Sequence, residues 1–312
     1  MSPISTLDNS LGYEQSDYDS LAKVSKVLAG MPDAWLCQWQ EVWLPVAAHV
    51  AQRVRLLQDQ TTPVIGIHGG QGSGKSTLSK GLAELYKAAF GWNVAIVSID
   101  DLYLTKAERQ TLSETIHPLL ATRGVPGTHD VDLGINLFNL FKNKSLQGAV
   151  QIPAFDKISD DRLPESQWHS IIDAVDLVIF EGWCVGCLPV ADELLSAPIN
   201  QLESDEDADG IWRSWVNQQL KEKYKTWFSM IDLLIVLQVP DMTAVLRWRS
   251  QQEEDNKKLS QSTAAGLDAK AMARFIQHYE RLTQQAVIEL PKVADLVLAI
   301  NQDHKVASIK QG

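Results

Sequence analysis

The chain has 312 residues, of which 45% are hydrophobic and 21% are charged, a composition typical of a globular protein with a sizeable core. Its formal net charge of −11 disfavours a nucleic acid as partner, because nucleic-acid binding normally needs a basic face. No apolar run approaches the roughly 20 residues that cross a bilayer, and the three cysteines suit a reducing compartment, so we expect a cytoplasmic protein without a membrane partner.

Residues 1–60 are predicted to form a helical extension that packs on the core. Apolar side chains recur there at spacings of three or four, the period of a helix: Trp35, Trp39, Trp43, Val46, Val50 and Val54. Such a stripe more often packs against apolar surface than binds a ligand. It would cover either the protein's own core or a second copy of the chain, so a homo-oligomer is one of two expectations here.

Five short apolar runs rich in β-branched residues follow at wide intervals: Val64 to His68, Val94 to Ile99, Leu177 to Phe180, Leu233 to Val239, and Leu296 to Ile300. Stretches with helical periodicity separate them, and this alternation predicts a mainly parallel sheet with crossover helices. The runs are apolar on both sides, as expected of strands that helices cover on both faces. The prediction is therefore a three-layer α/β domain over residues 61–305 with a five-stranded sheet.

The loop after the first run, GGQGSGKS, has the P-loop spacing of Gly69, four residues, Gly74, Lys75 and Ser76. Glycines let backbone N–H groups turn toward an anion, because they adopt dihedral angles closed to other residues. The Lys75 ammonium would reach the β- and γ-phosphates, and the Ser76 hydroxyl would ligate Mg²⁺. The fold is therefore predicted to be that of P-loop NTPases. The predicted nucleotide-binding residues are Gly69, Gly70, Gln71, Gly72, Ser73, Gly74, Lys75, Ser76 and Thr77.

The second run ends in VSIDDLYL, which places Asp100 and Asp101 where ligands of open α/β sheets bind. Phosphoryl transfer needs the attacking hydroxyl to be oriented, and a carboxylate can do this as general base. Helix capping or turn formation would account for one of the two acids. We predict that Asp100 is the catalytic base and binds the acceptor hydroxyl, with Asp101 as the alternative.

Two Gly/Pro/Asp-rich loops, RGVPGTHDVD and IPAFDKISDDRLPE, lie between the second and third runs. They carry Arg123, His129, Lys157 and Arg162, and loops of this kind often carry specificity residues. Each cation alone is more often a solvated loop charge, but together they predict a cationic pocket for a small anionic substrate. These four residues are the predicted substrate-binding set, together with Asp100.

The third run ends in FEGWCVGC, which carries Glu181 and two cysteines. A buried acid at a strand end is costly without a cation, so Glu181 is predicted to hold Mg²⁺ together with Ser76. Cys184 and Cys187 cannot by themselves supply the four ligands of a structural zinc site. Two readings stay open for them, namely buried structural thiols and a redox switch beside the site.

An insertion is predicted at about residues 188–230, helical from Ile211 to Ile231, with the acidic run ESDEDADG before it as a solvated loop. The segment RWRSQQEE after the fourth run opens a predicted lid over about residues 245–275. Arginines that close over a transferring phosphoryl group stabilise its developing charge. Arg247 and Arg249 are the candidates, and we predict Arg249 as the catalytic one.

These motifs occur in the same order as in a known family, over residues 35–305. The sequence resembles the plant and cyanobacterial type of D-glycerate 3-kinase, within the phosphoribulokinase, uridine kinase and pantothenate kinase group of P-loop kinases. The P-loop is shared by many NTPases, whereas RGVPGTHD, PAFDK and FEGW are much more specific. The segment after Glu254 and the acidic run near residue 205 depart from the family's pattern.

The resemblance implies ATP and Mg²⁺ as cosubstrates and transfer of the γ-phosphoryl group to the 3-hydroxyl of D-glycerate. It also implies that Asp100 occupies the position of the base, and that the reaction would belong to photorespiration in a photosynthetic cell. Two alternatives remain open at this stage. The acceptor could be another small hydroxyl compound, such as a nucleoside, pantothenate or a sugar phosphate, or the protein could be an ATP-dependent switch.

Overall fold

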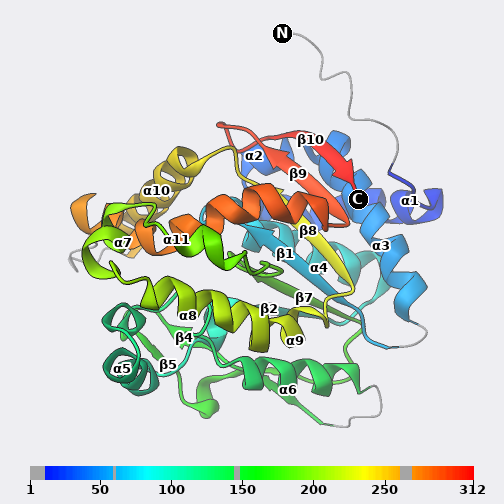
Figure 1. Cartoon of the computed structure of the whole chain (residues 1–312). Coiled ribbons are helices and arrows are strands. Elements are labelled where there is room, and N and C mark those ends of the chain that lie inside the picture. The colour runs from blue at the N-terminus through cyan, green and yellow to red at the C-terminus, as the bar shows by residue number, and fades with distance from the viewer. Residues whose placement is uncertain (1–10, 59–60, 144–147, 261–268) are drawn as a thin grey trace.

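A six-stranded sheet forms the centre of the computed structural model, which describes residues 11–58, 61–143, 148–260 and 269–312. The strand order is β10-β9-β8-β1-β7-β2, and all neighbours are parallel except β9 and β10 (Figure 1). The strands are β1 Val64–Gly69, β2 Val94–Ser98, β7 Leu177–Gly182, β8 Leu233–Gln238, β9 Leu296–Ile300 and β10 Val306–Gln311. The predicted three-layer, mainly parallel α/β fold is confirmed.

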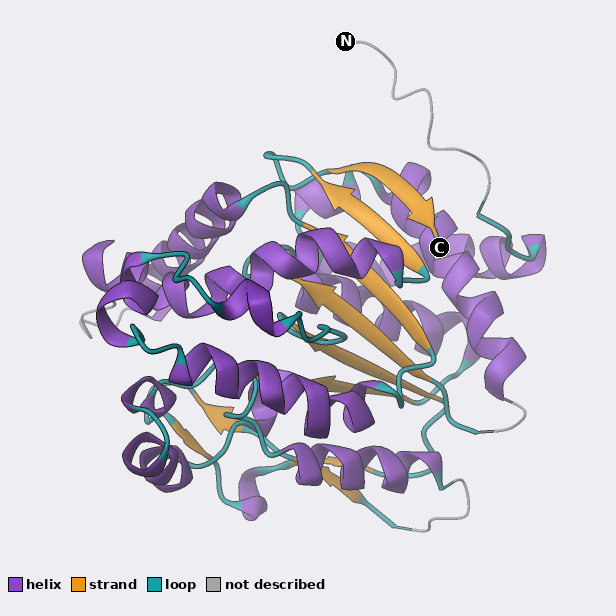
Figure 2. Ribbon diagram, viewed as in Figure 1, coloured by secondary structure: helices purple, strands orange, loops and turns teal. Residues whose placement is uncertain are grey.

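Helices cover both faces of this sheet, as Figure 2 shows. They are α1 Gln15–Lys23, α2 Asp33–Leu36, α3 Leu44–Gln58, α4 Lys75–Phe90, α5 Lys106–Thr115, α6 Val131–Lys142, α7 Gln201–Glu206, α8 Ile211–Gln219, α9 Lys225–Phe228, α10 Met242–Ser260 and α11 Ala269–Glu289. One apolar core lies between the sheet and α3 and α4, and a second between the sheet and α6, α9 and α11. No helix in the described part of the chain is long and apolar enough to cross a membrane.

The sheet has one strand more than the five predicted, and all five predicted runs are strands. The additional strand, β10, pairs antiparallel with β9 at the edge of the sheet and extends the domain past residue 305. In its sequence, VASIKQ, only Val306 is buried, and Ala307, Lys310 and Gln311 are exposed. An edge strand of this kind lacks the continuous apolar run by which the others were predicted.

The N-terminal region packs on the protein's own core but is not one continuous helix. After α2 the chain makes a π-helical turn, Trp39–Trp43, before α3 begins. This turn lets the Trp35 and Trp43 rings stack with centroids 5.1 Å apart, and both are buried in the core beside α4. The predicted stripe is therefore a packing surface of the core. Residues 1–10 of the predicted extension lie outside the described residues.

The predicted helical insertion is confirmed as α8 and α9, but the prediction of a solvated acidic loop before it is wrong. Residues 201–206 form helix α7, and Glu203 and Asp207 are 0% and 2% exposed. Glu203 forms an ion pair with Arg281 at 2.5 Å, and Asp207 forms one with Arg213 at 2.9 Å. Buried arginines thus neutralise charges that the local sequence leaves unbalanced, and a buried carboxylate is stable only with such partners.

Two small two-stranded sheets lie between α6 and β7 in the chain. One pairs β3 Val150–Ile152 with β6 His169–Ile171, and the other pairs β4 Phe155–Asp156 with β5 Asp161–Arg162. The second is a hairpin that carries the PAFDKISDDR motif. It lies against the segment after β2, because Phe155 N–H donates to Asp101 Oδ1 at 3.3 Å. The hairpin therefore brings a distant loop to the carboxyl end of the main sheet.

Candidate active site

Three neighbouring strands bring the predicted catalytic residues to one edge of the sheet. β7 lies between β1 and β2, and all three run parallel. The P-loop follows β1, Asp100 follows β2, and Glu181 lies near the end of β7. Glu181 pairs in register with Ile67, two residues before the P-loop begins at Gly69. It also pairs with Ser98, two residues before Asp100. The carboxyl ends of parallel strands are the usual ligand-binding edge of an open α/β sheet.

The P-loop backbone requires glycine at two positions. Gly72 and Gly74 have φ angles of +77° and +95°, which other residues rarely adopt. A Cβ atom at Gly72 would also lie 2.7 Å from Cβ of Trp248 in α10. Helix α4 begins at Lys75, whose ammonium donates to Gly70 O at 3.3 Å. A glycine-rich turn that leads into a helix N-terminus is a ready anion site, because free N–H groups and the helix dipole point to the same place.

The two predicted magnesium ligands are in contact. The Ser76 hydroxyl donates to Glu181 Oε1 at 2.9 Å, and Glu181 is only 6% exposed. Among the described residues, no cluster of three or more His, Cys, Asp or Glu side chains forms a metal site from protein ligands alone. A P-loop site does not need one, because Mg²⁺ takes one or two protein oxygens and completes its shell with phosphate and water. The residues present therefore fit Mg²⁺, which when bound would neutralise phosphate charge.

Asp100 is the carboxylate that faces the site. Its Oδ1 accepts from the Tyr103 hydroxyl at 2.9 Å, and its Oδ2 pairs with the Lys157 ammonium at 2.8 Å. Burial alone would raise its pKa, but Lys157 and Tyr103, with Lys75 nearby, hold the pKa of Asp100 below its usual value. Asp100 therefore stays ionised and can accept a hydrogen bond from an acceptor hydroxyl.

Asp101, the alternative base, has a different environment. Burial raises its pKa to about 6, although the hydrogen bond from Phe155 N–H opposes the shift. Asp101 Oδ1 accepts the hydrogen bond from Phe155 N–H at 3.3 Å, so this side chain connects the hairpin to the segment after β2. This is the turn-forming role expected for one acid of the pair. The geometry therefore favours Asp100 as the base.

His129 is buried at the back of the site. Its Nδ1 lies 2.6 Å from the Tyr224 hydroxyl, and its ring stacks on Tyr103 with centroids 4.6 Å apart. Tyr224 accepts a hydrogen bond from Gly127 N–H, so we assign its hydroxyl proton to His129 Nδ1 and the ring proton to Nε2. Burial lowers the pKa of His129 to about 3. His129 is thus a neutral ring that stacks on Tyr103. A contact between His129 and the substrate stays a prediction.

Acid is expected to destabilise the fold through three buried histidines. Burial lowers the pKa of His68 and His129 to about 3 and that of His278 to about 4, against about 6.5 when unfolded. The unfolded chain therefore binds these protons more tightly, and stability present above pH 6.5 is lost as the pH falls toward 3. At pH 5 each histidine should cost roughly 2 kcal/mol.

Chemical unfolding at pH 7.5 and pH 5 measures this effect. The wild-type free energy of unfolding should fall, although the raised pKa of Asp101 opposes part of the loss below pH 6. His278→Gln should show about one proton less uptake on unfolding than the wild type. An equal pH dependence in both proteins would refute the assignment for His278.

The predicted substrate cation Arg123 is engaged in a partly buried network of charged side chains that the sequence did not reveal. Its guanidinium forms an ion pair with Asp160 and lies 5.5 Å from the centre of the Phe155 ring. Asp160 also pairs with Arg109, which is 1% exposed and donates to Ala121 O at 2.9 Å. No motif pointed to Arg109, because it is an ordinary position within helix α5. Arg109 and Asp160 therefore set where Arg123 lies.

Lys157 and Arg162 both lie on the hairpin, but their side chains differ in exposure and in how many contacts hold them. Lys157 is 60% exposed at its side chain and pairs with Asp100 alone among the described residues. Arg162 is 13% exposed, donates twice to Tyr103 O, and pairs with Asp130 at 3.0 Å. Arg162 is thus a brace between two loops, and a substrate contact by Arg162 remains a prediction. Lys157 is the cation that an acceptor can reach.

The two lid arginines point to different sides of α10. Arg247 donates to Gln302 in the turn after β9 and lies near His304, which forms a hydrogen bond with the backbone of Gly72 in the P-loop. Burial and the negative charge of Asp100 raise the pKa of Tyr279, and the positive charge of Arg249 opposes this rise. Arg249 therefore lies near Tyr279. Each arginine thus lies near a different part of the site, and the catalytic role of Arg249 stays a prediction. Residues 261–268 of the predicted lid lie outside the described residues.

The two cysteines after Glu181 are free, buried thiols. Burial raises the pKa of both, and Cys187 Sγ lies 3.9 Å from His68 Nδ1. A thiol must ionise to react, so these are unreactive groups in the core. Of the two readings, the structure supports the structural one.

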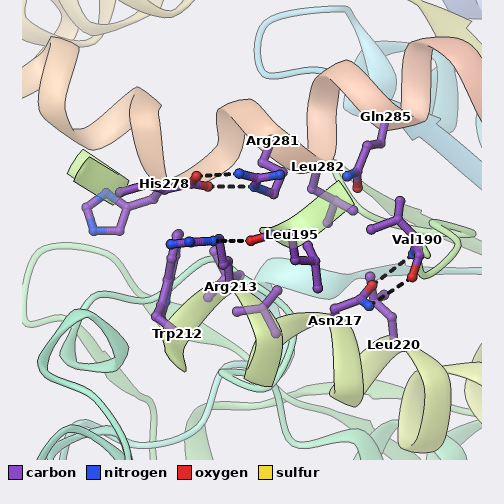
Figure 3. Close-up of a pocket in the computed structure, with 13 residues that line it drawn as sticks. Val190, Leu195, Trp212, Arg213, Asn217, Leu220, His278, Arg281, Leu282 and Gln285 are labelled. Atoms are coloured by element: carbon purple, nitrogen blue, oxygen red, sulfur yellow. Dashed lines mark hydrogen bonds and ion pairs between the residues drawn. The ribbon is translucent and has the colours of Figure 1, made fainter. Parts of the chain in front are cut away.

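A separate pocket lies between α8 and α11, behind the loop that follows Arg123 (Figure 3). Water-sized molecules reach only about 30 Å³ of it, which is room for about two waters. Apolar side chains, including Val125, Leu195 and Leu282, line much of its wall. The pocket holds none of the predicted catalytic residues, so it is not the acceptor site.

A P-loop, a buried acid on the adjacent strand that contacts the P-loop serine, and a carboxylate after the next strand form the arrangement of a nucleotide-dependent kinase of the P-loop class. The chain is 35% identical over 239 residues to Uncharacterized kinase mug58 of Schizosaccharomyces pombe, which covers 72% of this chain and 83% of that protein. The chain belongs to the same family, the P-loop kinases of the glycerate kinase and uridine kinase group.

Two further similarities agree with this family. The chain is 30% identical over 224 residues to the chloroplastic D-glycerate 3-kinase of Arabidopsis thaliana, a match that spans 69% of this chain but only 46% of that protein. The solved structure of D-glycerate 3-kinase from Cryptococcus neoformans superposes with a TM-score of 0.69 at 24% identity, over 87% of this chain and 99% of that one, and supports the fold. No family model matches the chain. The kinase relatives imply the use of ATP.

Proposed function

We propose that the protein transfers the γ-phosphoryl group of ATP to the 3-hydroxyl of D-glycerate, giving 3-phosphoglycerate. The observation that carries the proposal is the pair of Asp100 and Lys157, 2.8 Å apart at the edge of the sheet that holds the P-loop. A hydroxy acid presents a hydroxyl and a carboxylate a few bonds apart. Asp100 can accept from the hydroxyl while Lys157 pairs with the carboxylate.

The transfer itself needs little covalent chemistry from the protein. The acceptor oxygen attacks the γ-phosphorus, the bond from that phosphorus to the β-phosphate oxygen breaks, and Asp100 takes the hydroxyl proton. Lys75 stabilises charge on the β- and γ-phosphates. The donor end of the site is thus built on α4 and the acceptor end on the segment after β2 and the hairpin.

The acceptor end carries two cations, Arg123 and Lys157, with which an acceptor carboxylate could pair. The Arg123 guanidinium lies over the ring of Phe155, and Phe155 and Lys157 both belong to the hairpin. Arg123 pairs with Asp160, and Lys157 pairs with Asp100. An acceptor carboxylate can replace the Asp100 contact of Lys157 at little cost, because Lys157 is largely solvated. The similarity to D-glycerate 3-kinase of Arabidopsis thaliana supports the same acceptor.

Lys157→Met is expected to raise KM for D-glycerate about tenfold or more while KM for ATP changes less than twofold. The variant keeps the aliphatic stem but loses one ion pair to the acceptor carboxylate, and losing a charged hydrogen bond costs about 1.5–3 kcal/mol. Steady-state kinetics with each substrate varied in turn measures both constants.

Lys292→Met provides the matched control. Lys292 has almost the same exposure as Lys157 and a similar ion pair, to Glu289 at 2.7 Å, but it lies in the 3-10 turn Leu290–Lys292 between α11 and β9. This control should leave both constants unchanged. An unaltered KM for D-glycerate in Lys157→Met would remove the physical basis for an anionic acceptor.

A further inference from the structure

The backbone of Arg123 and Gly124 is held by three side chains, two of which come from distant parts of the chain. Tyr279 of α11 donates its hydroxyl proton to Arg123 O at 3.1 Å. Gly124 N–H donates to Thr128 Oγ1 at 3.0 Å, and the Trp183 indole N–H donates to Gly124 O at 3.1 Å. Each of these polar backbone atoms beside Arg123 therefore has its own side-chain partner.

Tyr279 is also packed tightly against this loop. Its side chain is 4% exposed, and its ring meets that of Trp183 edge to face with centroids 4.8 Å apart. Gly124 has a φ angle of +140°, and a Cβ atom there would lie 2.3 Å from the Tyr279 hydroxyl oxygen. The loop can approach Tyr279 this closely only because residue 124 is glycine.

Helix α11 is fixed in turn by the acidic segment of the insertion. Arg281 reaches from α11 to the buried Glu203, a pair drawn with dashed lines in Figure 3. The Asn200 side-chain amide donates to Gln277 O at 3.0 Å, and Leu202 N–H donates to Gln277 Oε1 at 2.7 Å. Tyr279 lies between Gln277 and Arg281 in α11, so these contacts also fix the position of its hydroxyl.

From these contacts we infer that Tyr279 is a positioning residue for the acceptor, acting through the backbone of Arg123. The inference deepens the proposed function and rests on it, because Arg123 is assigned there to the acceptor end. Tyr279 fixes the carbonyl at the root of the Arg123 side chain, and the pair of Arg123 with Asp160 fixes its tip. Affinity for an anionic acceptor then depends on a side chain of α11 that acts through the Arg123 backbone.

Tyr279→Phe tests the inference, because it removes one hydroxyl and keeps the ring against Gly124 and Trp183. KM for D-glycerate should rise about threefold to tenfold, as for the loss of one hydrogen bond, while KM for ATP changes less than twofold. Tyr86→Phe is the matched control. Tyr86 is buried in the other core and donates to a backbone carbonyl, Ala47 O, at 2.9 Å. It should leave both constants unchanged.

A double-mutant cycle separates positioning from a general structural loss. If Tyr279 acts through Arg123, Tyr279→Phe should change KM for D-glycerate less than 1.5-fold in an Arg123→Ala background. An equal effect in both backgrounds would overturn the inference, as would an unchanged KM in the single variant.

Hydrogen exchange provides a readout that does not depend on the acceptor. Amides of residues 123–130 should exchange at least about threefold faster in Tyr279→Phe than in the wild type, and at the wild-type rate in Tyr86→Phe. Unchanged exchange in Tyr279→Phe would refute the positioning role. If the wild type fails to phosphorylate D-glycerate, the proposed function fails, and faster exchange would still establish that Tyr279 holds the loop.

Discussion

Replacement of Asp100 by asparagine is expected to lower kcat for D-glycerate by about 10³-fold or more. Asparagine has the same shape but cannot take the hydroxyl proton, and a positioned general base contributes about 10² to 10⁴ in rate. It also loses the ion pair with Lys157, which now helps to place that side chain. ATP binding should change little, since the P-loop contacts do not involve Asp100. ADP release and equilibrium ATP titration measure the two effects.

Asp101→Asn is the control for this variant, since Asp101 is the next residue and serves the hairpin rather than the acceptor. An asparagine side-chain oxygen can still accept from Phe155 N–H, so kcat should stay within about fivefold of the wild type. The base assignment would be wrong if Asp101→Asn lost turnover while Asp100→Asn retained it.

Replacement of Glu181 by glutamine is expected to lower kcat/KM for ATP by about 10²-fold or more. A metal ion supplies several kcal/mol of charge stabilisation in phosphoryl transfer, and glutamine keeps the hydrogen bond to Ser76 but loses the negative charge that attracts the cation. The Mg²⁺ concentration for half-maximal rate should rise in the same variant. Rates measured at fixed ATP across a Mg²⁺ titration give both values.

Ser76→Ala should resemble Glu181→Gln, because the two side chains are in contact and serve one cation. Ser79→Ala is the matched control. Ser79 lies one turn further along α4, and its hydroxyl donates to Lys75 O rather than facing Glu181. A wild-type Mg²⁺ requirement in Glu181→Gln would show that this acid does not serve the metal.

Much of the fold could be predicted from sequence because the signals were local. A parallel strand buried on both faces is an apolar run, and four of the five predicted runs are such strands, while the fifth, β2, lies at the edge of the sheet and is partly exposed at alternate residues. The P-loop was equally readable, since a positive φ favours glycine, as at Gly72 and Gly74. The order of the strands was not readable, because it depends on contacts between distant segments.

The residues of the site could be predicted from sequence, but the distant side chains that pair with them or hold them in place could not. Asp100, Lys75, Ser76 and Glu181 follow strands or open a helix, so the fold alone brings them together. The buried pair of Glu203 with Arg281 could not be predicted, because its members lie 78 positions apart and each looks solvated in its own segment. The same applies to Tyr279, which meets the Arg123 loop across 156 positions.

The most direct test of the proposed function is ADP release with ATP and Mg²⁺ against D-glycerate, L-glycerate, glycerol, uridine and pantothenate. The proposal predicts turnover with D-glycerate, little with glycerol because it lacks the carboxylate, and loss of that turnover in Asp100→Asn. Turnover with uridine or pantothenate in place of D-glycerate, or none with any acceptor while ATP still binds, would contradict it.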